Sequence, residues 1–114
     1  MTIIASSQYI RKTNDKIFLA LNYPRLKQAL QWYIQTYSGK LITEWFACEW
    51  ADANLKVGKI LYTNVLYWKA LNDMIYIAKK YNVEKDVQLY SSYKNLIYEH
   101  IQKQFWNGEY FIDW

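Results

Sequence analysis

The sequence predicts an all-α chain of antiparallel helical hairpins with one core. Apolar residues recur at helical spacing in two stretches, and a third stretch between them is apolar almost all round. Apolar residues make up 53% and charged residues 21% of the 114 residues, which is typical of a globular domain rather than of a disordered chain. We therefore expect a single domain over residues 1–114.

The first element in order is a helix end and turn in "SQYIRKTND", followed by the short apolar piece "KIFLAL". A complete helix is then predicted to begin at Pro24, because proline suits the first turn, and to end near Gly39. Its apolar stripe follows the spacing i, i+3, i+4, i+7, i+8, i+11 and consists of Leu26, Ala29, Leu30, Tyr33, Ile34 and Tyr37.

The segment from Lys40 to Lys59 lacks helical period and predicts a long ordered connection, a type usually found with a functional role. A second helix is predicted to begin near Thr63. Between Val65 and Ala78 it has only three polar residues, Lys69, Asn72 and Asp73. A helix that is apolar on nearly every side is normally surrounded by others.

A third helix is predicted from Glu84 to Phe105, and Asn107-Gly108 predicts a tight turn after it. The last residues are mostly large and apolar, whereas chain ends are commonly polar and frayed. We therefore expect the chain to be a fragment or truncated form of a larger protein. The alternative is an oligomer that covers the same surface.

Composition and charge exclude several classes of protein. The net charge is +4 and the pI about 9.1, but the basic residues are scattered and no nucleic-acid motif accompanies them. No apolar run approaches the length of a membrane span, and no secretory signal is present. The single cysteine, Cys48, cannot form an internal disulfide. The sequence predicts a cytoplasmic protein that binds neither nucleic acid nor membrane.

The stretch "ACEWADAN" places Glu49, Trp50 and Asp52 together in the long connection. A carboxyl group beside an indole is desolvated, which raises its pKa and suits it to act as a general acid in glycosidic cleavage. Such cleavage needs a second carboxylate, and Glu44 is a further acid in this connection. The alternative is structural: an acid bonds backbone amides and Trp50 fills the core.

Other chemistries have less support. His100 lies near the apolar stripe of the last helix and is predicted to be a buried histidine rather than a ligand. Metal-ligand spacing and a glycine-rich phosphate loop are both absent from the sequence. We therefore expect no metal or organic cofactor.

The segment "EWADANLKVGKILYTNVLYWKALNDMIYIAKKYN" resembles part of the six-hairpin (α/α) barrel glycosidases. The strongest likeness is to the amylo-alpha-1,6-glucosidases of glycogen debranching. These enzymes have a W-x-D loop, then a Gly-Lys turn, an aromatic residue, an Asn and an aromatic-rich helix. The similar features in this sequence are, in the same order, Trp50 with Asp52, Gly58-Lys59, Tyr62, Asn64 and the helical stretch "LYWKAL". The likeness extends over nearly the whole chain.

This resemblance implies a partial (α/α)6 toroid that acts on α-glucosidic bonds of an oligo- or polysaccharide. Asp52 would be the catalytic acid, Trp50 the wall of the sugar subsite, and Tyr62 and Asn64 polar contacts to the sugar, with Glu49 secondary. The base is expected beyond Trp114, so the isolated chain is expected to be nearly inactive. The other function that fits is a small all-α self-associating interaction protein without catalytic activity.

Overall fold

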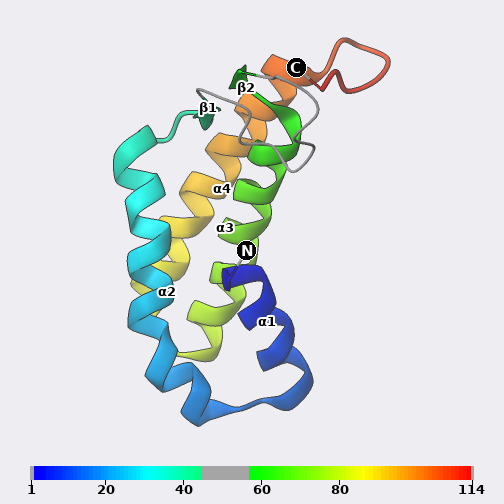
Figure 1. Cartoon of the computed structure of the whole chain (residues 1–114). Helices are drawn as coiled ribbons and strands as arrows, with labels where there is room; N and C mark the ends of the chain where they lie inside the picture. The colour runs from blue at the N-terminus through cyan, green and yellow to red at the C-terminus, as the bar shows by residue number, and fades with distance from the viewer. Residues whose placement is uncertain (1, 45–56, 114) are drawn as a thin grey trace.

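The computed structural model describes residues 2–44 and 57–113, which form four helices and two short strands (Figure 1). Consecutive helices run antiparallel, so the prediction of an all-α chain of helical hairpins is confirmed. The elements in order are α1 (Thr2–Thr13), α2 (Lys16–Tyr37), β1 (Thr43–Glu44), β2 (Gly58–Lys59), α3 (Leu61–Lys80) and α4 (Glu84–Phe105).

The bundle has two different ends (Figure 1). The α1–α2 and α3–α4 connections lie together at one end, which we call the turn end. The two strands, the last turns of α4 and the C-terminal segment lie at the other, which we call the ladder end. Because the long connection leaves from the strands, the candidate site is at the ladder end.

The central helix is α3, which packs against α1, α2 and α4. Leu71, Met74 and Ile77 on this helix have no exposed surface. The prediction that a nearly apolar helix is surrounded by others is confirmed, and much of the cover comes from helices of the same chain. Its buried acid, Asp73, is compensated by the Lys69 ammonium, whose Nζ lies 2.9 Å from Asp73 Oδ1.

The start of α2 differs from the prediction, because the helix begins at Lys16 and Pro24 lies inside it. Asp15 is the N-cap, and its carboxylate accepts the Phe18 N–H at 2.9 Å. The piece "KIFLAL" therefore forms the first turns of α2. Pro24 removes one backbone donor from the helix interior, a loss that the cap and the packing of the helix outweigh.

The end of α2 agrees with the prediction, since the helix ends at Tyr37, just before Gly39. Gly39 has a φ of 77°, in the left-handed region that favours glycine. A Cβ at this position would lie 2.7 Å from Cδ2 of Leu96 on α4. Glycine thus lets the chain leave α2 and pass closely against α4.

The later helix bounds are also close to the predicted ones. α3 begins at Leu61, near the predicted Thr63, and α4 spans the predicted Glu84–Phe105. None of the helices in the described part of the chain combines the length and apolarity needed to cross a membrane.

The C-terminal segment folds back at the ladder end. Asn107 Oδ1 accepts two backbone N–H groups of the following turn, each at 2.9 Å, and Gly108 has a φ of 101°. The predicted tight turn at Asn107-Gly108 is therefore confirmed. The N–H of Leu61 donates to the carbonyl of Asp113 at 2.9 Å, which fastens the segment to the start of α3.

Candidate functional site

The five predicted site residues fall into two groups. Glu49, Trp50 and Asp52 belong to segment 45–56, which lies outside the described residues. Tyr62 and Asn64 lie in the first turn of α3, at the ladder end. Tyr62 is 40% exposed, whereas Asn64 has no exposed surface. The two residues of α3 therefore have different roles.

The two strands pair directly at the base of segment 45–56. β1 and β2 are antiparallel, with Thr43 opposite Lys59 and Glu44 opposite Gly58. Since β1 ends at Glu44 and β2 begins at Gly58, this ladder holds the two chain ends that flank the segment side by side. The long ordered connection predicted from the sequence thus has a fixed base.

Asn64 locks that base onto α3. Its Oδ1 accepts the N–H of Ile42 at 2.7 Å, and its Nδ2 donates to the carbonyls of Ile42 at 3.1 Å and Ile60 at 2.9 Å. Ile42 directly precedes β1 and Ile60 directly follows β2. The buried amide therefore binds backbone on both sides of the ladder, and in this structure it is a positioning group.

Glu44 is a second buried polar group at the ladder. Its side chain is 9% exposed, and its Oε1 accepts the hydroxyl of Thr63 on α3. Its Oε2 has no hydrogen-bond partner within residues 2–44 and 57–113. Burial, with smaller contributions from Tyr33 and Glu44, raises the pKa of Tyr37 above its ordinary value. Glu44 thus joins β1 to α3 while keeping one carboxylate oxygen unused.

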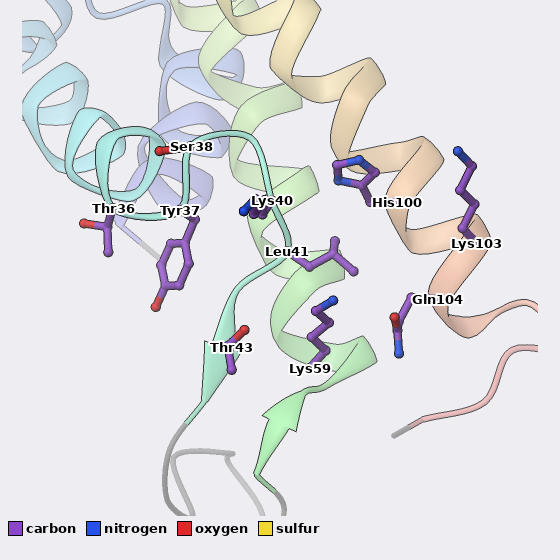
Figure 2. Close-up of a pocket in the computed structure, with 10 residues that line it drawn as sticks. All are labelled: Thr36, Tyr37, Ser38, Lys40, Leu41, Thr43, Lys59, His100, Lys103 and Gln104. Carbon is purple, nitrogen blue, oxygen red and sulfur yellow. The ribbon is translucent and has the colours of Figure 1, made fainter.

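A cavity of about 440 Å³ lies beside the ladder (Figure 2). Its lining comes from the end of α2 and the connection after it, from both strands, and from the last turns of α4 (Figure 2). The described residues that line it are Thr36, Tyr37, Ser38, Lys40, Leu41, Thr43, Lys59, His100, Lys103 and Gln104.

The charge of this cavity is one-sided. Lys40, Lys59 and Lys103 all line it, and no described lining residue is acidic. None of the three lysines forms an ion pair within the described parts of the chain. Among the described residues, no carboxylate competes with an anion for these ammonium groups. No group of three metal-ligating side chains occurs among the described residues.

Sequence reasoning missed this cavity, because its cations come from segments far apart in the chain. The prediction that His100 is a buried histidine was wrong, since His100 is only half-buried and lines the cavity. Its position near the apolar stripe of α4 did not predict how far its side chain is buried. Only the close pass of the chain at Gly39 brings the Lys40 segment to α4.

Residues 3–113 match the family described as the glycosyl hydrolase 94 superfamily, catalytic domain. The chain belongs to this family. No curated protein and no solved structure matches it.

Membership makes the chain glycoside hydrolase-like, with a carbohydrate as its substrate class. It thereby supports the glycosidase resemblance at the level of the enzyme class. The family match does not distinguish amylo-alpha-1,6-glucosidases from other glycosidases, and it does not describe a partial (α/α)6 toroid. Both therefore stay predictions.

Proposed function

We propose that the chain forms the acid-donating side of a glycoside hydrolase site that cleaves glucosidic bonds. Asp52 is the general acid that protonates the leaving oxygen. Trp50 holds the sugar ring and, by desolvating the carboxyl group, raises the pKa of Asp52. Tyr62 hydrogen-bonds a sugar hydroxyl, and Glu49 is a secondary polar contact. No cofactor takes part.

The observation that supports this proposal best is the fixed base of segment 45–56. A catalytic acid must be held to within roughly 0.5 Å of its productive position relative to the scissile bond. The ladder of β1 and β2 and the three hydrogen bonds of Asn64 supply rigid anchors for both flanks of the segment. A loop that only solvates its acids would have no use for such anchoring.

The proposal gives Asn64 a different role from the polar sugar contact that the resemblance implied. All three hydrogen bonds of its amide go to backbone, and the side chain is fully buried. We therefore assign it to positioning: it holds the ladder, and the ladder holds the flanks of the segment that carries Asp52.

The substrate linkage is the finer part of the proposal. The likeness to debranching glucosidases favours an α-glucosidic bond and an inverting reaction, whereas membership of the family fixes no anomeric configuration. We therefore propose an α-glucan as the ligand and use a β-linked disaccharide as the comparison. Hydrolysis also needs a second carboxylate aligned with Asp52, so the first test measures binding rather than turnover.

Isothermal titration with maltose and maltotriose tests the site, with cellobiose as the β-linked comparison. We expect Trp50→Ala to weaken maltotriose binding by about fivefold, since one aromatic contact contributes about 1 kcal/mol. Trp32→Ala is the matched control, because Trp32 lies on α2 and is 57% exposed. Equal affinities of wild type and Trp50→Ala would contradict the sugar site, and tighter cellobiose binding would contradict the α-linkage.

The self-associating interaction protein stays the alternative, and a second cavity gives it a concrete surface. This cavity measures about 240 Å³ and is lined by Leu61, Val65, Trp68, Tyr98, Ile101, Gln102 and Phe111. Analytical ultracentrifugation over a wide range of protein concentration distinguishes the two functions. Concentration-dependent dimerisation that Tyr98→Ser abolishes, with no sugar bound, would favour the interaction protein.

A further inference from the structure

The cavity beside the ladder carries more cations than its structural position explains. A lysine at a helix C-terminus often stabilises the helix dipole, and Lys103 lies in the last turn of α4. Lys59, however, lies on β2, and Lys40 follows the end of α2 after a left-handed turn. Three lysines from three separate elements converge on one cavity without an acid among its described lining residues.

The same cavity presents neutral hydrogen-bonding groups between the cations. Thr36, Thr43 and Gln104 line it, and none of their side chains makes a hydrogen bond within the described part of the chain. Leu41 adds an apolar patch to the lining. Hydroxyl and amide groups beside an apolar surface are suited to a sugar ring, while the ammonium groups are suited to an anion.

The size of the cavity fits a small ligand rather than a bound ion alone. Its volume of about 440 Å³ lies within the range of about 300–1,000 Å³ that is common for ligand pockets. Its position is also informative. Thr43 and Lys59 pair across the ladder and both line the cavity, so a ligand there touches the base of segment 45–56.

We propose that this cavity is a binding subsite for an acidic sugar unit, whose carboxylate pairs with Lys40, Lys59 and Lys103. Thr36, Thr43 and Gln104 hydrogen-bond the ring hydroxyls. The inference rests on the proposed function in one respect, namely that the ligand is a carbohydrate. It adds that the preferred carbohydrate carries a negative charge.

Titration of the full chain with sodium glucuronate, glucose and inorganic phosphate tests the subsite, with calorimetry and NMR shifts of the His100 ring as readouts. We expect glucuronate to bind at least about tenfold more tightly than glucose, since a charged hydrogen bond contributes more than a neutral one. The triple variant Lys40→Gln, Lys59→Gln, Lys103→Gln is expected to lose at least about tenfold in glucuronate affinity. Glucuronate binding is also expected to weaken with added salt.

The matched control is the triple variant Lys12→Gln, Lys16→Gln, Lys85→Gln, which removes the same charge from exposed lysines elsewhere. An equal loss of affinity in both triple variants would overturn the proposal, because it would show attraction to net charge alone. Phosphate binding as tight as that of glucuronate would also overturn it, since the ring would then contribute nothing. Trp50-dependent binding of maltotriose without a preference for glucuronate would remove this inference and leave the proposed function standing. Lysine-dependent glucuronate binding, with maltotriose binding unaffected by Trp50→Ala, would support this subsite and contradict the proposed role of Trp50.

Discussion

The two ends of the bundle use lysine in opposite ways. At the turn end, Lys27 Nζ lies 3.1 Å from both carboxylate oxygens of Asp86, and the hydroxyl of Tyr23 donates to Asp86 Oδ2 at 2.6 Å. Asp86 is only 4% exposed. At the ladder end, three lysines line a cavity and have no ion-pair partner among the described residues.

The contrast separates charge that stabilises the fold from charge that is left for a ligand. The Tyr23–Asp86–Lys27 cluster ties α2 to α4, and both its carboxylate and its hydroxyl are used. Burial, and then the hydrogen bond to Asp86, raises the pKa of Tyr23 far above its ordinary value. The cavity beside the ladder holds no comparable cluster among the residues that the structure describes, and we therefore expect its lysines to contribute little to stability.

The largest expected effect is at the turn end. Asp86→Ala leaves the buried hydroxyl of Tyr23 and the Lys27 ammonium without their acceptor. We expect a loss of about 3 kcal/mol in the free energy of unfolding, at the low end of the cost of breaking a buried pair because Lys27 is partly exposed. Urea denaturation measures this loss of stability. Glu84→Ala, on the exposed side of the same first turn, is the control and should change stability by less than about 0.5 kcal/mol. A loss in Asp86→Ala no larger than in the control would show that the turn end is not held by this cluster.

The next effect is at the ladder end, and it tests the positioning role of Asn64. Asn64→Ala leaves the N–H and carbonyl of Ile42 unsatisfied, and we expect a loss of about 2 kcal/mol in the free energy of unfolding. Hydrogen exchange should also show faster exchange of the Ile42 amide, because its acceptor is gone. Asn72→Ala, on the half-buried side of α3, is the control. Normal protection of Ile42 in Asn64→Ala would refute the positioning role.

Much of the helical framework follows from local patterns in the sequence. The apolar stripes, Gly39 and Asn107-Gly108 predicted the helices and turns because each depends on near neighbours in the chain. Pro24 misled the prediction of the start of α2, since a general preference for the first turn was outweighed by the Asp15 cap. The Asp15 cap is itself a local signal, whereas the packing that also offsets the donor lost at Pro24 is tertiary and is not contained in a local pattern.

The candidate site was less predictable. The ladder joins residues on either side of segment 45–56, and the cavity beside the ladder is lined by α2, both strands and α4. Neither the strand pairing nor the convergence of residues at the cavity leaves a periodic pattern in the sequence from which it could be predicted. Asn64 was singled out by resemblance alone, and only its three backbone hydrogen bonds identify what it holds. Glu49, Trp50 and Asp52 stay predictions from the sequence.

A matched pair of tyrosines sharpens the contrast between used and unused polar groups. The hydroxyl of Tyr23 has an acceptor, whereas that of Tyr67 on α3 is buried without a partner in the described residues. We expect Tyr23→Phe to cost about 1 kcal/mol, and Tyr67→Phe to be neutral or stabilising by up to about 1 kcal/mol at neutral pH. Denaturant unfolding of both variants measures the difference, and a similar loss in each would contradict it.

The same Tyr67 predicts a dependence on alkaline pH. Burial raises the pKa of Tyr67 from 10.0 to about 12, so the folded state favours the protonated phenol. The stability that this group contributes is fully present below pH 10 and is lost as the pH rises through 12. Tyr67→Phe should therefore lose less stability than wild type between pH 10 and pH 12, with Tyr98→Phe as an exposed control. Parallel losses in Tyr67→Phe and wild type would contradict the shift.

The smallest expected effect on stability comes from removing the three cavity lysines at the ladder end. The triple variant Lys40→Gln, Lys59→Gln, Lys103→Gln should change the free energy of unfolding by less than about 0.5 kcal/mol, because its lysines have no ion-pair partners among the described residues. Lys103 stabilises the dipole of α4, but weaker repulsion between the three cations offsets the removal of its charge. Lys27→Gln, which removes one paired lysine at the turn end, should cost more than all three together. Urea unfolding in low salt measures both variants. A larger loss in the triple variant would mean that the cavity lysines serve the fold, and the difference between the two ends would disappear.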